Sequence, residues 1–345
     1  MKIVWVCNST EAETDLWRAA QNHADLDIET WCVSAVEGKI ELPYFQHGVL
    51  RPGPEGRREL LERVAAVGAD LFVFRYPTWL TADGLEGTFR RLFADRPVIG
   101  WVSEQGPTKE WALATMKHFA WVAVNARVEL PFYRAALPGV KLSYLPFGCA
   151  WRTDEELTSR PQYLADFVAD GSCHYLCGEY GGWKKPSVDV MVRPLLDQDI
   201  ALWGHAPDRC GWKGVPGAAG KYRGAYAPVE HAQVYTSSKV YLGISWNWSL
   251  GGYGIKLARA LGAGICTMWH RTVGMELDGI IPGVHLVAPG TAEETRAEGL
   301  RLLGDSEARQ TIAAAGRAFA LAHWEWGANL KRLIDDVHHG REERP

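Results

Sequence analysis

Short apolar runs alternate with amphipathic stretches from the first residues onward, and this alternation restricts the fold more than any other feature of the sequence. In the first half, residues 11–24 and 56–67 carry apolar side chains at helical spacing. The apolar runs around these stretches are expected to be buried strands, at residues 2–7, 26–32, 71–74, 98–102, 121–124 and 142–145. Strands that alternate with helices in this way pair in parallel and form a doubly wound sheet.

The alternation starts again after a polar stretch at residues 152–162, which we interpret as the start of a connection between two domains. Strands are expected at residues 173–177, 200–203, 240–245, 264–268 and 284–287, and helices at 292–303, 306–321 and 324–337. A chain of 345 residues is also longer than one hydrophobic core usually supports. We therefore predict an α/β protein with two Rossmann-like domains, residues 1–150 and 151–345. Their parallel sheets are expected to face a cleft, and the last helix is expected to cross the junction.

The composition excludes several classes of protein. Hydrophobic residues make up 47% and charged residues 23%, which is typical of a folded globular chain and not of a disordered one. The longest apolar runs, such as residues 119–124, are far shorter than the roughly 20 residues of a membrane-spanning helix. The first residues have the pattern of a strand and not of a signal peptide, so we predict a cytoplasmic protein with no membrane span. The net charge of -4 provides no overall attraction to nucleic acid.

The seven cysteines have no paired short spacings, and several lie inside apolar runs, so we interpret them as buried thiols. Residues 173–177 place two cysteines and a histidine close together, but a zinc site of this kind needs a second matching pair. We therefore predict no bound metal. The first strand is followed by no Gly-x-Gly-x-x-Gly turn, which disfavours a dinucleotide-dependent dehydrogenase.

A glycine-rich turn between a strand and a helix is the strongest candidate for a binding site. The predicted strand ends at Ser245, and the helix begins near Gly254. Glycines let the backbone approach a ligand, and the amides at the start of a helix favour a phosphate group. Lys256 would add a positive charge in the first helical turn. A purely structural role for this turn is equally compatible with the pattern.

At this turn the sequence resembles the retaining glycosyltransferases of the GT-B type, family 4, and especially their CgeB-like group. Gly252-Tyr253-Gly254 is similar to the family's Gly-Phe-Gly loop, and residues 260–264 are similar to its Ala-Met-Ala-x-Gly helix end. The resemblance covers about residues 175–335, and more loosely the first half from about residue 70.

Basic and glycine residues before the turn extend the resemblance. Gly178, followed by Lys184 and Lys185, matches the loop and basic residue that hold the donor diphosphate in the family. Gly204 and Ser245 also occur where the family pattern places them. His205 follows directly and is the histidine best placed to approach a donor, although a structural role is its alternative.

The resemblance implies a GT-B fold and transfer of a sugar from a nucleotide diphosphate sugar, as co-substrate, to an acceptor with a free hydroxyl. It also implies retention of configuration, with no metal and no other cofactor. The leaving diphosphate gains negative charge during transfer, so nearby cations lower the barrier, and we assign catalytic roles to Lys256 and Lys185. The predicted donor-binding residues are Gly178, Lys184, Lys185, Gly204, His205, Ser245, Gly251, Gly252, Tyr253, Gly254, Lys256 and Arg259.

The sequence departs from the family at two positions. The family's two glutamates would fall at Gly251 and Arg259, and neither residue is acidic. Those carboxylates normally hold the donor sugar and the ribose, so neither the sugar nor the nucleotide is predicted. Arg259 either contacts a phosphate or carboxylate or lies solvated on the surface. If the reaction inverts configuration, Glu104 at a strand end is the leading general base, with a surface or capping role as its alternative.

The first domain is expected to bind the acceptor. The candidate residues lie at or near strand ends and are Arg75, Tyr76, Trp79, Trp101 and Glu104. The aromatic side chains could stack on an acceptor or equally fill the core. The acceptor is left open among a glycan, a peptide and a small molecule, and a hydroxymethylated base of phage DNA is an alternative that the net charge disfavours. Two further alternatives are a non-catalytic nucleotide-sugar binder and a nucleotide-sugar epimerase.

Overall fold

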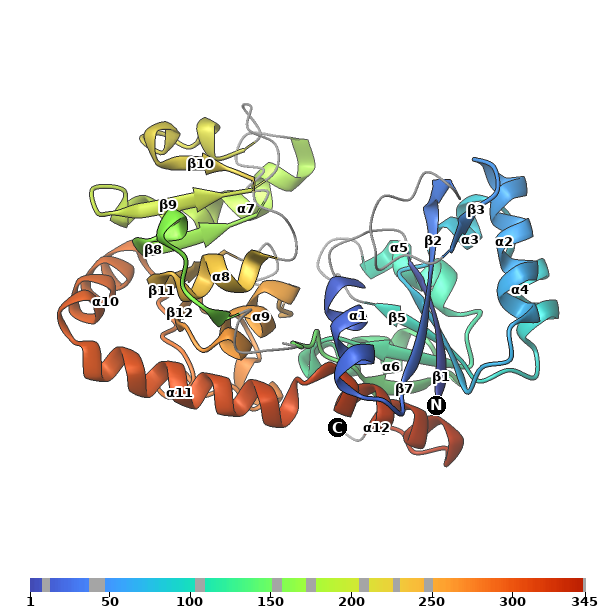
Figure 1. The fold of residues 1–345 in the computed structure, drawn as a ribbon. Helices are drawn as coiled ribbons and strands as arrows, with labels where there is room; N and C mark the ends of the chain where they lie inside the picture. The colour runs from blue at the N-terminus through green and yellow to red at the C-terminus, as the bar shows by residue number, and fades with distance from the viewer. Residues whose placement is uncertain are drawn as a thin grey trace. The chain divides into compact units, whose positions relative to one another are not determined.

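The computed structural model of the protein describes residues 1–7, 13–36, 47–102, 109–150, 157–171, 178–204, 211–225, 230–244 and 251–343. The chain divides into two units, and each is built on its own parallel sheet (Figure 1). The first unit comprises Met1–Ala150 and Trp326–Pro345, and the second comprises Trp151–Glu325. The predicted α/β class with two parallel sheets is confirmed.

The first unit contains a seven-stranded sheet in the order β3-β2-β1-β4-β5-β6-β7, and all neighbouring strands are parallel. The strands are β1 (Lys2–Cys7), β2 (Asp27–Val36), β3 (His47–Val49), β4 (Leu71–Arg75), β5 (Val98–Val102), β6 (Trp121–Val124) and β7 (Lys141–Tyr144). The α-helices of this unit are α1 (Glu13–Asn22), α2 (Pro54–Ala66), α3 (Trp79–Ala82), α4 (Glu86–Phe93), α5 (Lys109–Met116), α6 (Leu130–Ala136) and α12 (Trp326–His338).

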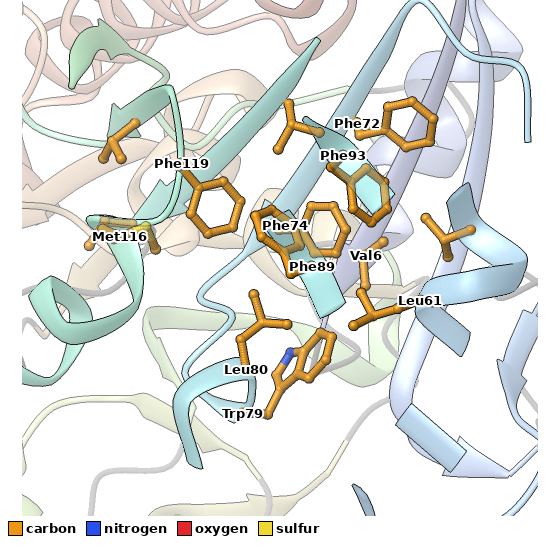
Figure 2. Close-up of a cluster of buried hydrophobic side chains, with 14 of the residues drawn as sticks. Val6, Leu61, Phe72, Phe74, Trp79, Leu80, Phe89, Phe93, Met116 and Phe119 are labelled. Carbon is orange, nitrogen blue, oxygen red and sulfur yellow. The ribbon is translucent and has the colours of Figure 1, made fainter. Parts of the chain in front are cut away.

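Consecutive residues of β4, β5 and β6 are all buried. Since side chains alternate between the two faces of a sheet, both faces are covered at these strands. Val6 of β1 joins Phe72 and Phe74 of β4 in a hydrophobic core on the face that α2 and α4 cover. Figure 2 shows this core, where the rings of Phe74, Phe89 and Phe93 pack with centroids 5.1 to 5.3 Å apart. These rings come from β4 and α4, so the core ties the helix to the sheet.

The C-terminal helix α12 packs on the first unit. The ring of Trp326 meets Trp5 and Trp101 edge to face, with centroids 5.8 and 5.6 Å away, and its amide donates to the Cys149 carbonyl at 3.1 Å. The sequence prediction placed residues 326–345 in the second domain. They belong to the first unit because the apolar face of α12 completes a tryptophan cluster there, which a helical pattern alone does not reveal.

The second unit contains a five-stranded parallel sheet in the order β10-β9-β8-β11-β12. The strands are β8 (Ala165–Asp170), β9 (Ile200–Trp203), β10 (Tyr222–Gly224), β11 (Ser238–Gly243) and β12 (Cys266–Trp269). The α-helices are α7 (Gly178–Met191), α8 (His231–Thr236), α9 (Ile255–Ala263), α10 (Ala292–Gly304) and α11 (Ser306–His323). β8 is therefore the central strand.

Alternation along the central strands of the second sheet determines which side chains share a face. Phe167 and Ala169 of β8 belong to the hydrophobic core formed with α7 and α10, so Asp170 has the opposite orientation. Val240 of the neighbouring strand β11 belongs to the same core, so Tyr241 also has the opposite orientation. Asp170 and Tyr241 therefore lie on one face of the sheet, near its centre.

Most predicted strands are present, and four have the predicted bounds, at residues 2–7, 98–102, 121–124 and 200–203. The strand predicted at residues 173–177 lies outside the described residues. The first strand of the second sheet is β8, which the prediction missed because aspartates at positions 166 and 170 give it a polar pattern. Residues 284–287 do not form a strand and make only single bridges, Met268 with Val287 and Pro282 with Leu286.

Candidate functional site

The carboxyl ends of β8 and β9 form an edge that carries glycines in place of side chains. β8 continues into Gly171 and β9 into Gly204, with φ angles of 106° and 152° that other residues rarely adopt. A Cβ atom on Gly204 would lie 2.4 Å from the Gly171 carbonyl oxygen, so the two backbone segments approach too closely for a larger residue. Ligands of parallel α/β sheets bind at this edge, because the loops that follow the strands gather there.

Lys256 places its ammonium group at this edge. The residue lies in the first turn of α9, which begins after Gly254. Its Nζ donates a hydrogen bond to the main-chain oxygen of Asp170 at 2.9 Å and lies 4.0 Å from Oδ1 of the same residue. A Cβ atom on Gly171 would lie 1.5 Å from this Nζ, so the glycine makes room for the cation. The Lys256 side chain is 20% exposed, so a ligand in solvent can reach it.

A buried carboxylate lies next to this lysine. The Asp170 side chain is 2% exposed and accepts hydrogen bonds from two phenol groups. Tyr241 of β11 donates to Oδ1 at 2.7 Å, and Tyr235 of α8 donates to Oδ2 at 3.1 Å. A buried carboxylate needs such donors, since burial without them is costly.

Asp170, Tyr235 and Tyr241 are not among the site residues predicted from the sequence. Tyr235 and Tyr241 are 65 and 71 residues away from Asp170 along the chain, so no local motif contains them. The one available signal is an acidic residue followed by a glycine, Asp170-Gly171, after a short apolar run.

The glycine-rich turn before α9 has a backbone that suits close approach of a ligand. Gly251 and Gly252 have φ angles of 84° and 99°. Gly254 caps α9 without a side-chain hydrogen bond, and the first amides of a helix have no acceptor within the helix. Such amides favour an anion. The Tyr253 side chain is 5% exposed and packs near Trp324, with ring centroids 5.9 Å apart, so it is a packing residue in this structure.

Two further basic candidates, Arg259 and Lys185, differ in exposure. Arg259 of α9 is 5% exposed, so the solvated surface position considered for it is wrong, and its contact with a donor stays a prediction. The Lys185 side chain on α7 is 49% exposed, and its Nζ donates to Oδ2 of Asp189 at 2.6 Å. Asp189 also accepts from Arg193 at 3.1 Å. Lys185 therefore has an ionic partner within its own helix, and its contact with a donor also stays a prediction.

Several predicted residues cannot be placed as side chains. His205, Ser245 and Glu104 lie outside the described residues. Gly178 is the first residue of α7, and Lys184 lies in the same helix, where only the backbone is described. Their proposed roles stay predictions.

The aromatic acceptor candidates of the first unit fill its core. Trp101 is fully buried, and its Nε1 donates to the Leu145 carbonyl at 2.9 Å. Trp79 is 7% exposed and belongs to the core that Figure 2 shows. Strands of a parallel sheet are covered on both faces, so these two rings fill the core, which is one of the two roles that the sequence allows. The structure therefore contradicts their assignment as acceptor-stacking residues.

Arg75 and Tyr76 lie at the carboxyl end of β4. Arg75 is 7% exposed, and its guanidinium lies 5.7 Å from the ring centroid of Trp101 and 5.8 Å from that of Phe147. Tyr76 has a φ of 45°, which is unusual for a residue other than glycine. Its amide donates to the Trp101 carbonyl at 2.9 Å, which holds the turn against β5.

The residues that the structure describes contain neither a metal-binding cluster nor a membrane-spanning helix. Within those ranges, no group of three or more His, Cys, Asp and Glu side chains is arranged to hold a metal ion. No helix among them combines the length and apolar character needed to cross a membrane.

The two parallel-sheet units define the GT-B fold, which solved structures confirm over the whole chain. HepE of Anabaena in complex with UDP-glucose has a TM-score of 0.70 and 13% identity, over 98% of this chain and 100% of that one. Sucrose-phosphate synthase of Thermosynechococcus elongatus has a TM-score of 0.68 and 14% identity, over 99% and 100%. A glycosyltransferase of Rickettsia africae has a TM-score of 0.61 and 11% identity, over 98% of each chain. At these identities the likeness establishes the fold alone.

One family model matches part of the chain. Residues 187–335 are similar to the family described as Glycosyl transferase-like. The matched segment contains the glycine-rich turn, Lys256 and Arg259. No curated protein matches the sequence. The closer resemblance to the CgeB-like group stays a prediction.

Proposed function

We propose that the protein is a glycosyltransferase that moves a sugar from a nucleotide diphosphate sugar to an acceptor hydroxyl, with the donor bound by the second unit. The observation that carries the proposal is the position of Lys256. Its ammonium group lies at the carboxyl end of the central strand, beside Gly171 and in the first turn of α9. A diphosphate favours this combination of a cation, helix amides and close backbone approach. The family-model match over residues 187–335 supports the same function.

A UDP sugar is the donor that we propose. HepE, which has the same fold, was solved with UDP and with UDP-glucose. In this chain the diphosphate would face Lys256 Nζ and the amides that follow Gly252. The departing UDP gains negative charge as the glycosidic bond breaks, so a cation held there stabilises the transition state more than the ground state.

Retention of configuration and independence from metal are part of the proposal and follow from the resemblance to the family 4 glycosyltransferases. Lys256 supplies positive charge to the leaving group from the protein itself. Lys185 is the proposed second cation and would have to exchange its contact with Asp189 for one with the donor.

The acceptor is proposed to bind the first unit through a hydroxyl of a glycan, a peptide or a small molecule. Arg75 and Tyr76, at the carboxyl end of β4, are the residues that we propose for acceptor binding. The positive φ of Tyr76 is a strained conformation, and such strain is concentrated at binding and catalytic sites. Glu104 would be the general base if the reaction inverts configuration.

An assay of UDP release tests the proposal. The protein is incubated with UDP-glucose, UDP-galactose or UDP-N-acetylglucosamine, with and without a mixture of sugars, glycans and hydroxyl-bearing peptides. We expect UDP release that depends on the acceptor and continues in the presence of EDTA, and a glycosylated product whose anomeric configuration matches that of the donor.

Each other outcome of this assay has a defined meaning. Activity that stops in EDTA and returns with a divalent cation would contradict metal independence. Conversion of the donor sugar without any acceptor would indicate an epimerase. Binding of the donor with neither reaction would indicate a non-catalytic binder.

A further inference from the structure

Lys256 and Tyr241 share one carboxylate oxygen. Tyr241 donates to Oδ1 of Asp170 at 2.7 Å, and the Lys256 ammonium lies 4.0 Å from the same oxygen. Tyr235 donates to the other oxygen, Oδ2, at 3.1 Å. Of the side chains in the described ranges, Asp170 alone pairs with Lys256, through its main-chain oxygen at 2.9 Å and this longer ionic contact.

The distance of 4.0 Å between Lys256 Nζ and Asp170 Oδ1 is longer than that of a direct hydrogen bond between an ammonium and a carboxylate group. A direct charge-assisted hydrogen bond would bring the two atoms to about 2.8 Å. In such a contact the carboxylate would neutralise part of the ammonium charge and occupy one of its three N–H donors. Because Tyr241 already donates to Oδ1, the lysine bonds instead to the main-chain oxygen, and donors remain that can face a ligand.

We propose that Tyr241, supported by Tyr235, is a positioning residue that prevents the Asp170 carboxylate from capturing Lys256. The hydrogen bond from Tyr241 to Asp170 thus keeps the Lys256 ammonium available to an anionic ligand at the sheet edge. The inference rests on the proposed role of Lys256 in holding the donor diphosphate.

Burial separates this role from direct binding. Tyr235 and Tyr241 are fully buried, so neither hydroxyl can reach a ligand in solvent. The two rings pack together with centroids 4.8 Å apart, and phenylalanine at either position keeps that contact. A change in ligand affinity on removal of one hydroxyl is therefore indirect, and the hydrogen bonds to Asp170 connect both hydroxyls to the neighbour of Lys256.

The test compares the UDP affinity of the wild type with that of three variants, measured by titration calorimetry. Tyr241→Phe removes the donor from Oδ1, Lys256 moves onto that oxygen, and UDP binding weakens about 10-fold. In the double variant Tyr241→Phe and Asp170→Asn, the carboxylate charge that would attract Lys256 is absent, and the UDP affinity returns to within about 3-fold of that of the wild type. Tyr235→Phe is the matched control, because it removes a donor from the oxygen farther from Lys256, and its loss is smaller than that of Tyr241→Phe.

A crystal structure of Tyr241→Phe without ligand gives a second readout, which does not depend on the proposed function. We expect Lys256 Nζ and Asp170 Oδ1 to lie about 3 Å apart in it, and urea unfolding checks that the variant is folded. An unchanged separation, unchanged UDP affinity in Tyr241→Phe, or a double variant no better than the single one would overturn the inference. Absence of UDP binding to the wild type would instead overturn the proposed donor, and the crystal structure would still decide whether the tyrosine restrains the lysine.

Discussion

Gly171 is the residue that gives Lys256 its place at the sheet edge. Its φ of 106° disfavours any other residue, and a Cβ atom there would lie 1.5 Å from the lysine Nζ. Gly171→Ala should therefore cost about 1 to 3 kcal/mol of unfolding free energy through backbone strain. It should also displace the ammonium and weaken UDP binding by about 10-fold or more. Urea unfolding and titration calorimetry measure the two effects.

Gly220→Ala is the control for that substitution. A Cβ atom at Gly220 meets no other atom within 4 Å, so stability and UDP affinity should both stay close to wild type. Equal behaviour of the two alanine variants would show that the close approach at Gly171 has no role in the site.

His270 should make the stability of the second unit depend on pH. The residue follows β12, is 3% exposed, and burial lowers its pKa from the ordinary value of 6.5 to about 4. The folded state therefore favours the neutral imidazole, so the contribution is complete above pH 6.5 and is lost as the pH falls from 6.5 towards 4. The loss should reach at most about 3 kcal/mol.

Urea unfolding between pH 8 and pH 4.5 checks this prediction. His270→Asn should flatten the dependence of unfolding free energy on pH in the acidic range. His339→Asn, at a residue whose side chain is 62% exposed, should leave the wild-type slope. The same slope in His270→Asn and the wild type would contradict the assignment.

Helix α12 is the element whose removal should most affect the first unit. Trp326 is fully buried against Trp5 and Trp101, and a Cβ atom on Gly148 would lie 2.6 Å from its ring. Trp326→Ala should cost about 3 to 5 kcal/mol, the usual range for a large aromatic side chain removed from a core. Leu50→Ala in the same unit should change stability by less than about 0.5 kcal/mol, because Leu50 is 54% exposed. Similar unfolding free energies for the two variants would mean that α12 adds little to this unit.

Sequence pattern predicted elements well where a strand is apolar throughout. Strands β5, β6 and β9 have the predicted bounds for this reason. β8 was not predicted because its two aspartates give the segment a polar pattern that is typical of a loop. In the fold each aspartate has a partner. Asp166 pairs with Lys239 at 2.7 Å, and Asp170 is held by two tyrosines. A local pattern cannot show such partners, since they come from other elements.

The same limit applies to the candidate site. Lys256 and the glycine-rich turn could be predicted, because one continuous segment contains both the turn and the start of a helix. Asp170 and its tyrosines could not, because three separate elements bring them together. Trp101 was open to two roles, since an aromatic residue at a strand end looks the same in sequence whether it faces a ligand or the core.

Each unit has a hydrophobic core of its own, and the contacts described above for Lys256 and Asp170 lie within the second unit. Lys256, Asp170, Tyr235 and Tyr241 belong to residues 151–325, as do the glycines at the sheet edge. We therefore propose that this unit binds the nucleotide at the edge of its parallel sheet.

Calorimetric titration of UDP into the wild type and two lysine variants tests whether Lys256 holds the donor diphosphate. Lys256→Ala should weaken UDP binding by about 10-fold to 150-fold, through loss of a charge-assisted contact with phosphate. Lys239→Ala is the matched control, because Lys239 lies near the amino end of β11 and pairs with Asp166 at 2.7 Å. The UDP affinity of this variant should stay within about 2-fold of that of the wild type. Wild-type affinity in Lys256→Ala would show that Lys256 does not hold the diphosphate, and no UDP binding by the wild type would rule out UDP as the nucleotide of the donor.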